Sequence, residues 1–178
     1  MKKRIAVIGN SGGGKTVLCR RLSQLNNIPV THIDAIQFLA GLKIRPHNET
    51  IAILNEVMQR ESWIIDGFGP LDILEKRLQL ADQIVFIDFP LRRHFWWCAK
   101  RQIENIWLPR TEIPEDCNEA TWSQTMKLFK SVWNVHYLMR PELLKILHRP
   151  NNEKKLISVT NLQQWNALFH QDIEVQSR

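Results

Sequence analysis

The sequence predicts a doubly wound α/β fold, in which a five-stranded parallel sheet is covered by helices on both faces. Two observations predict it. Short, strongly apolar runs alternate with longer segments of helical periodicity, and a glycine-rich segment joins the first apolar run to the first helical pattern. Short apolar runs connected through helices are typical of parallel strands buried on both faces. Right-handed crossovers then place helices on the two sides of one sheet.

The elements follow one another in a regular strand and helix order. The expected strands are Arg4–Ile8, Ile28–Ile33, Trp63–Ile65, Gln83–Asp88 and Lys154–Val159. The expected helices are Lys15–Leu25, Asn48–Arg60, Pro70–Gln79, Leu91–Ile106, Trp122–Met139 and Pro141–Leu147. In Leu91–Ile106, for example, apolar residues recur near helical spacing, which predicts an amphipathic helix packed on the sheet. The stretch Trp107–Ala120 carries two prolines and mixed charges without periodicity, so we expect a loop or lid at about 107–120.

Length and composition predict one domain, residues 1–178. A chain of 178 residues can bury a substantial core but is short for two domains. With 44% hydrophobic and 24% charged residues it has ordinary globular composition. No run is long enough to cross a bilayer, so no membrane association is expected. Three widely spaced cysteines, Cys19, Cys98 and Cys117, fit reduced thiols and a cytoplasmic location. The sequence leaves the oligomeric state open.

Residues Gly9–Thr16 form a complete phosphate-binding motif, Gly-x-x-x-x-Gly-Lys-[Ser/Thr], between a strand and a helix. Small residues let successive backbone N–H groups surround an anion, and the helix N-terminus adds partial positive charge. Lys15 would reach the β- and γ-phosphates of ATP, and the hydroxyl of Thr16 would hold Mg²⁺. The residues expected to bind the nucleotide are Gly9, Ser11, Gly12, Gly13, Gly14, Lys15 and Thr16. The alternative is a flexible glycine-rich hairpin or helix entry.

Aspartates follow three of the expected strands, at the sheet edge where ligands bind in open parallel sheets. They are Asp34, Asp66 and Asp88. A carboxylate beside the phosphate loop supplies the hard oxygen that Mg²⁺ requires, and Asp66 is the first choice for this role. The alternative for Asp34 and Asp66 is a helix cap or a turn. For Asp88, which precedes Phe89-Pro90, the turn is the favoured interpretation.

The basic residues indicate an anionic partner without identifying it. The net charge is +6 and the isoelectric point about 9.5, which nucleotide phosphates, nucleic acid or an acidic protein would all satisfy. Phosphoryl transfer needs cations on the moving group, so we expect at least one of Arg93, Arg101 and Arg110 to contact phosphate. The alternative for each is a solvated helix face. The seven tryptophans are expected to pack in the core and lid rather than to stack on bases.

Four segments together resemble a known group of proteins: Gly9–Thr16, His32-Ile33-Asp34-Ala35, Trp63–Gly67 and Val85–Pro90. They are similar to the adenylate-kinase-like P-loop proteins of the DNA topology modulation group. The resemblance covers roughly the first hundred residues and implies a five-stranded parallel core with an arginine-bearing lid. It also implies that the loop holds ATP phosphates, that Asp34 faces the acceptor and that Asp66 lies near Mg²⁺.

The chain departs from adenylate kinases after the third strand. Those enzymes continue their Asp-Gly with Phe-Pro-Arg, whereas this chain reads Asp66-Gly67-Phe68-Gly69-Pro70 and lacks the arginine that would hold a nucleoside monophosphate. Relatives also tend to carry Trp and Pro in the region of Phe38–Arg45, where this chain has neither. These departures argue against AMP as the acceptor.

The sequence therefore predicts an ATP- and Mg²⁺-dependent phosphotransferase acting on an unidentified small acceptor. The expected catalytic residues are Lys15, Asp34, Asp66, Arg93, Arg101 and Arg110, with Thr16 and Asp66 at the metal. Two alternatives stay open. One is an ATP-binding regulatory or nucleic-acid-associated protein with little phosphotransfer, although no reading motif such as a helix-turn-helix is visible. The other is a structural ATP-binding subunit.

Overall fold

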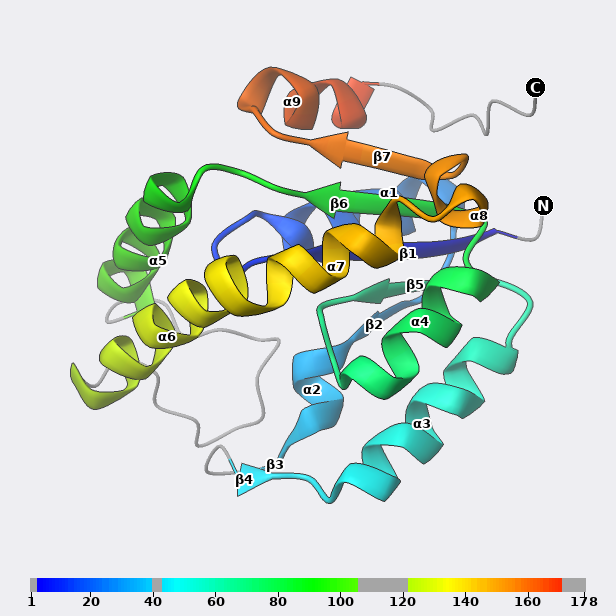
Figure 1. Ribbon diagram of the computed structural model, residues 1–178, viewed down its shortest axis with the longest axis horizontal. Coiled ribbons are helices and arrows are strands. Elements are labelled where there is room, and N and C mark those ends of the chain that lie inside the picture. The colour runs from blue at the N-terminus through cyan, green and yellow to red at the C-terminus, as the bar shows by residue number, and fades with distance from the viewer. Residues whose placement is uncertain (1–2, 40–42, 106–121, 171–178) are drawn as a thin grey trace.

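The computed structural model describes residues 3–39, 43–105 and 122–170 and confirms the predicted α/β fold. Five parallel strands form the central sheet in the order β2-β5-β1-β6-β7 (Figure 1). Their bounds are β1 Arg4–Gly9, β2 Val30–His32, β5 Trp63–Asp66, β6 Gln83–Ile87 and β7 Leu156–Val159. The strand carrying the phosphate motif lies in the middle, so its carboxyl end has neighbours on both sides.

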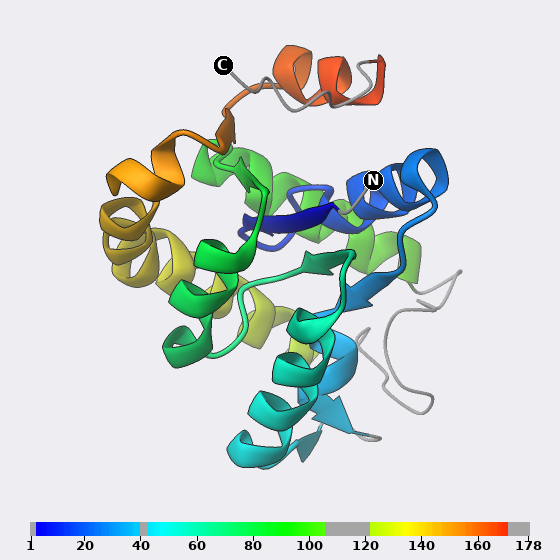
Figure 2. The same ribbon diagram turned by 90° about the vertical axis from the view of Figure 1, so that its right-hand side faces the viewer.

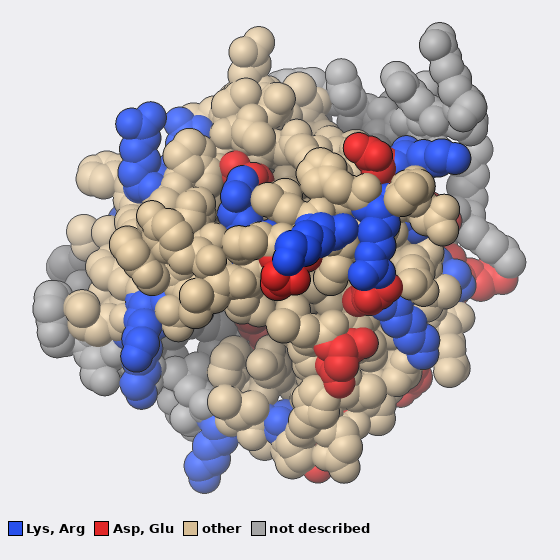
Figure 3. All heavy atoms as spheres, in the orientation of Figure 1, with Lys and Arg blue, Asp and Glu red and all other residues tan. Residues whose placement is uncertain are grey.

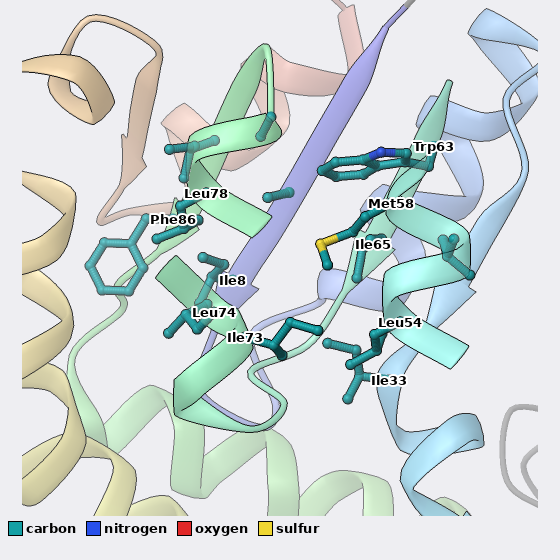
Figure 4. Packing of buried hydrophobic residues seen from close by; sticks show 14 of the residues in the cluster. Ile8, Ile33, Leu54, Met58, Trp63, Ile65, Ile73, Leu74, Leu78 and Phe86 are labelled. Carbon is teal, nitrogen blue, oxygen red and sulfur yellow. The ribbon is translucent and has the colours of Figure 1, made fainter. Parts of the chain in front are cut away.

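Alternating side chains of β1 supply two hydrophobic cores, one on each face of the sheet. Ala6 and Ile8 belong to the core beneath α3 (His47–Gln59), α4 (Leu71–Leu80) and α7 (Arg140–Leu147). Figure 4 shows this core, with the fully buried Trp63 among its largest members. Ile5 and Val7 belong to the opposite core.

The second core is covered by helices from both ends of the chain. Buried residues of α1 (Lys15–Asn26) and α9 (Leu162–His170) pack on it, and Trp97 of α5 (Leu91–Asn105) lies against its edge. Figure 2 shows the sheet between the helices of the two sides. The sheet is thus covered on both faces, as the run lengths predicted.

The structure adds short elements that the sequence did not indicate. Asp34 was expected to follow a strand ending at Ile33, but β2 ends at His32 and Asp34 lies in the first turn of α2 (Ile33–Gln37). Further additions are the antiparallel pair β3 (Phe38–Leu39) and β4 (Lys43–Ile44), the helix α8 (Pro150–Glu153) and α9. Except for α9, each is too short to carry a clear periodic pattern.

The expected helix Trp122–Met139 changes its geometry in its last turn. The α-helix α6 covers Trp122–Asn134, and the π-helical turn η2 covers Val135–Met139 before α7 begins. The N–H of Arg140 donates to the carbonyl of Val135, a π-type bond. Pro141 has no N–H to donate, and its ring would clash with the carbonyl four residues earlier in a regular α-helix. This accounts for the wider π-helical turn.

The predicted lid lies outside the described residues, as do Arg110 and Cys117. The lid therefore stays a prediction. Among the helices that the structure describes, none combines the length and the apolar character needed to cross a membrane.

Candidate active site

The phosphate loop leaves β1 and turns into α1 with glycines in the left-handed region. Gly12 has φ +71° and Gly14 has φ +75°. A Cβ atom on Gly12 would lie 2.9 Å from both the Cys98 sulfur and the His94 carbonyl oxygen, so α5 packs too closely for any side chain there. The first turn of α1 has no acidic residue and no side-chain cap, which leaves its positive end uncompensated.

Two polar side chains, one in the loop and one on α5, connect the loop to neighbouring helices. Asn10 Oδ1 accepts from the Ser11 N–H at 2.8 Å, and Asn10 Nδ2 donates to the Val132 carbonyl of α6 at 2.7 Å. His94 Nδ1 donates to the Ser11 carbonyl at 2.8 Å. Burial lowers the pKa of His94 to about 4, so the ring is neutral at neutral pH and its proton is on Nδ1. Sequence reasoning missed both residues, because Asn10 occupies a variable motif position and His94 is distant in sequence.

Lys15 and Thr16 both have hydrogen-bond partners within the protein. Lys15 Nζ donates to the Asn10 carbonyl at 3.0 Å, across its own loop. The Thr16 hydroxyl donates to Asp66 Oδ2 at 3.1 Å. The structure thus brings the predicted phosphate-binding and metal-binding residues of α1 next to the carboxylate at the end of β5.

Asp66 is a buried carboxylate, and only one of its oxygens has hydrogen-bond partners among the described residues. Its Oδ2 atom contacts Thr16 and His32, whereas its Oδ1 atom is buried without a hydrogen-bond partner among the described residues. Burial alone raises the pKa of Asp66, but the hydrogen bond from His32, the charge of Lys15 and the bond from Thr16 outweigh it. The net pKa is therefore lowered and the group is anionic at neutral pH.

The oxygen set of Thr16 and Asp66 fits Mg²⁺ in a nucleotide complex. Mg²⁺ is usually held by one or two protein oxygens, with phosphates and water completing its shell. The described part of the chain has no cluster of three His, Cys, Asp or Glu side chains that would form an all-protein metal site. The Thr16 hydroxyl and the Asp66 carboxylate, with its unpartnered Oδ1, are oxygen groups of the kind that bind a phosphate-bound Mg²⁺.

A cavity of about 420 Å³ joins these groups. It extends from Asp34 and Asp66 past residues 11–17 of the loop and α1 to Leu162 and Trp165 of α9. The Trp165 ring lies close to the loop, since a Cβ atom on Gly14 would be 3.1 Å from it. Asp34 is exposed at the same cavity, so the two predicted carboxylates share one space. Sequence reasoning missed α9, although Leu162, Trp165 and Leu168 have helical spacing.

The three arginines predicted to contact phosphate have different positions. Arg101 lines the cavity, and its Nε atom is buried without a hydrogen-bond partner in the described part of the chain. Arg93 does not line it. Its guanidinium carbon lies 5.3 Å from the centre of the Phe89 ring and 5.7 Å from that of Trp97. Arg110 lies outside the described residues.

A buried arginine supports the segment that follows Asp66. Arg77 of α4 is 1% exposed, and its Nη2 atom donates to the carbonyls of Gly67 at 2.8 Å and Phe68 at 3.1 Å. Its Nε and Nη1 atoms have no partner among the described residues. Burial lowers the pKa of Arg77 to about 10, and the charge of Asp66 opposes this shift. Sequence reasoning missed Arg77 because nothing in a helical pattern marks an inward-facing cation.

Asp88 forms an ion pair with an arginine of α7 and does not lie in the turn that was favoured for it. Both of its carboxylate oxygens accept from Arg140, at 2.7 and 2.6 Å, so it joins the end of β6 to the start of α7. This bidentate pair raises the pKa of Arg140. Asp88 is also absent from the cavity lining.

Two tryptophans are more exposed than expected. Trp96 of α5 is 68% exposed and Trp133 of α6 is 51% exposed, whereas Trp63 is fully buried. In Figure 3 the surface over α6 carries Lys and Arg side chains and no Asp or Glu, while acidic side chains gather over α3 and α4. Packing in the core is therefore wrong for Trp96 and Trp133.

Solved structures of small-molecule kinases share this fold. The chain matches shikimate kinase from Acinetobacter baumannii, solved with shikimate, at TM-score 0.57 and 15% identity over 92% of this chain and 87% of that one. A sugar kinase from Janibacter sp. matches at TM-score 0.54 and 12% identity over 96% and 91%. Shikimate kinase from Bacteroides thetaiotaomicron matches at TM-score 0.54 and 15% identity over 94% of both chains.

These similarities show the fold alone. No protein-family model matches the chain, and no curated protein matches it. The sheet order, the phosphate loop and the matched structures define a P-loop protein with the nucleotide-kinase-like fold.

Proposed function

We propose that the protein is an ATP- and Mg²⁺-dependent phosphotransferase acting on a small hydroxyl-bearing acceptor. The observation that supports this proposal most is that the phosphate loop, the anionic Asp66 with its unpartnered oxygen, and Asp34 line the same cavity. The fold shared with small-molecule kinases supports the proposal. The resemblance to the DNA topology modulation group is part of it and rests on the four sequence segments.

The donor side is assigned to the loop and its cations. Backbone N–H groups of residues 12–14 and the first turn of α1 would bind the phosphates, and Lys15 would exchange the Asn10 carbonyl for them. Thr16 and Asp66 would hold Mg²⁺, which when bound neutralises charge on the phosphates. Arg101, already at the cavity, would add a further cation for the transferred group.

The acceptor side is assigned to Asp34. Its carboxylate would accept the proton of the acceptor hydroxyl as that oxygen bonds to the γ-phosphorus and the bond to ADP breaks. General-base help of this kind contributes about 10²- to 10⁴-fold. Asp34→Asn is therefore expected to lower turnover while leaving ATP affinity nearly unchanged.

We infer that the acceptor carries no phosphate. Two arginines near this side are committed to backbone carbonyls: Arg77 binds those of Gly67 and Phe68, and Arg45 Nε donates to that of Ile36 at 2.7 Å. Arg45 also pairs with Glu49 at 3.5 Å. These two arginines thus have partners within the protein, and the carboxylate of Asp34 would repel a second phosphate at this side of the cavity.

The test has a binding part and a turnover part. Lys15→Ala should weaken Mg·ATP binding about 10- to 100-fold in calorimetry, the effect of losing a contact between charged groups. Lys76→Ala is the matched control, because that lysine binds Asn55 on the exposed surface at 2.7 Å and does not line the cavity. No ATP binding by folded wild-type protein at millimolar nucleotide would overturn the proposal.

The turnover part compares acceptors in matched pairs. Nucleosides with their 5′-monophosphates, and sugars with their sugar phosphates, are incubated with ATP and protein while ADP production is followed. We expect the unphosphorylated member of a pair to support turnover. Faster turnover with the monophosphates would refute the assignment of a neutral acceptor.

A nucleic-acid-associated function is the second candidate. The exposed Trp96 and Trp133, together with the basic surface over α6, favour it, because stacking rings among cations bind single strands. A functional complex should resist physiological salt and respond to ATP, whereas nonspecific attraction should fall steeply as salt is added. We expect the steep fall.

A further inference from the structure

A histidine outside the predicted site contacts the carboxylate on which the proposed metal site depends. His32 Nδ1 lies 2.9 Å from Asp66 Oδ2, and the two side chains are 20% and 6% exposed. An ionised carboxylate only accepts hydrogen bonds, so the proton in this bond is on Nδ1. The assignment holds whether the ring is neutral or charged.

The sheet itself sets this contact. His32 is the last residue of β2, and its partner in the register between β2 and β5 is Asp66. Register partners in a parallel pair place their side chains on the same face. The backbone ladder therefore holds the imidazole beside the carboxylate without help from a ligand.

The two oxygens of Asp66 consequently differ. Oδ2 has two donors, the Thr16 hydroxyl and His32 Nδ1, whereas Oδ1 is buried without a partner among the described residues. Two donors on one oxygen fix the rotation of the carboxylate. Of these two donors, Thr16 is also a predicted metal ligand. His32 is therefore the donor that can orient the Asp66 carboxylate without binding Mg²⁺ itself.

We propose that His32 is a positioning residue for the metal site: its hydrogen bond to Oδ2 fixes the orientation in which the Asp66 carboxylate, whose Oδ1 has no partner among the described residues, meets the Mg²⁺ of bound ATP. This inference rests on the proposed function. Groups that orient a metal-binding side chain commonly change metal affinity about 10- to 100-fold when removed. His32 would act through Asp66 and need not touch nucleotide or acceptor.

The experiment measures ATP binding by calorimetry as Mg²⁺ is titrated, and again in the presence of EDTA. His32→Ala should raise the Mg²⁺ concentration required for tight ATP binding about 10- to 100-fold and leave metal-free ATP binding unchanged. His32→Asn should need nearly as little Mg²⁺ as the wild type, because the amide nitrogen of asparagine takes the place of Nδ1. His32→Gln, whose amide lies where Nε2 would be, should behave like the alanine variant.

The matched control is a second histidine and aspartate pair on the surface. His47 Nε2 lies 2.8 Å from Asp72 Oδ2, both side chains are more than half exposed, and neither lines the cavity. His47→Ala should leave Mg²⁺ dependence unchanged. Thermal unfolding of each variant shows whether a binding change reflects lost structure.

The outcomes separate the two proposals. Wild-type protein that binds ATP with no Mg²⁺ dependence overturns the proposed metal site itself. Wild-type protein that needs Mg²⁺ while His32→Ala needs no more of it overturns only the role of His32. An equal loss of metal-free and metal-dependent binding in a folded His32→Ala protein, or equal behaviour of the Asn and Gln variants, also overturns that role.

Discussion

Replacing Arg77 by methionine should leave stability almost unchanged while loosening the segment after Asp66. Arg77→Met removes two hydrogen bonds from a charged donor, to Gly67 at 2.8 Å and Phe68 at 3.1 Å. Bonds of this kind contribute about 1.5–3 kcal/mol each, so their loss costs about 3–6 kcal/mol. Methionine retains most of the aliphatic volume of the buried stem.

Opposing terms of similar size come from the buried charge. Arg77 has no salt-bridge partner among the described residues, and its Nε and Nη1 atoms lack hydrogen bonds there. Burying an ion costs several kcal/mol even after relaxation, and the methionine variant avoids this penalty. The net change in the free energy of unfolding should therefore stay within about 2 kcal/mol of zero.

Two further variants make the test decisive. Arg77→Ala should lose about 2–3 kcal/mol more than Arg77→Met, because it also leaves a cavity. Arg77→Lys keeps the buried charge but lacks the planar guanidinium that binds both carbonyls. For the small volume that it removes, we expect it to lower the free energy of unfolding more than the methionine or alanine variant does. Urea unfolding followed by tryptophan fluorescence gives the free energies. A methionine variant as unstable as the alanine variant would refute the reasoning that a costly buried charge is retained here.

The segment held by Arg77 connects to the acceptor side. Gly67 and Gly69 have φ +116° and +69°, and a Cβ atom on either would contact the side chain of Ile33, the neighbour of Asp34. The expected functional signature of Arg77→Met is thus normal ATP affinity with a raised KM for the acceptor, once a substrate is identified.

Two other predictions follow from cations and protons near the loop. Arg101→Ala should weaken Mg·ATP binding about tenfold in calorimetry, because Arg101 lines the cavity. Arg93→Ala, its control in the same helix, should keep that affinity and lose about 1 kcal/mol of stability with its ring contacts. Equal effects of the two variants on ATP binding would contradict the placement of Arg101, and not Arg93, at the phosphates. The pKa of His94 is about 4 in the folded protein and about 6.5 in the unfolded chain. As the pH falls from about 6.5 to about 4, the unfolded state therefore binds the proton first and the free energy of unfolding decreases, by about 2 kcal/mol at pH 5. His94→Asn, which can still donate to Ser11 without titrating, should flatten that part of the urea-unfolding profile, and an unchanged slope would argue against a buried neutral ring.

Features of the fold that depend on neighbouring residues could be predicted from the sequence. The phosphate motif, the five strands and most helices follow from periodicity and spacing, and the adjacency of β1, β5 and β6 brings Asp66 to the phosphate loop. Asp34 was predicted at the end of a strand but lies in the short helix α2. A helix of five residues is too short to show a helical repeat in the sequence. The missed helix α9 is different, because its apolar spacing was present in the sequence, and its omission left Trp165, which lines the cavity, out of the predicted site.

Contacts across the fold could not be read from such patterns. The pairing of His32 with Asp66 depends on the register of β2 against β5, and the bond from His94 to Ser11 spans 83 residues. Arg77 reaches Gly67 only because α4 returns along the same face. A polar residue in an amphipathic helix is expected at the surface, so its inward direction carries no sequence signal.

The environment of Asp66 links stability to the proposed chemistry. A buried carboxylate is costly, and asparagine would fit a strand end with less desolvation. Instead, three side chains from two elements place donors or positive charge around this one anion: the Thr16 hydroxyl and the ammonium of Lys15 from α1, and the imidazole of His32 from β2. Their combined effect lowers the pKa of Asp66 although burial opposes it, and one oxygen stays without a partner. An anion that is kept charged, oriented and partly unsatisfied beside a phosphate loop has the properties required to bind a hard cation, and this is why we assign the metal to Asp66.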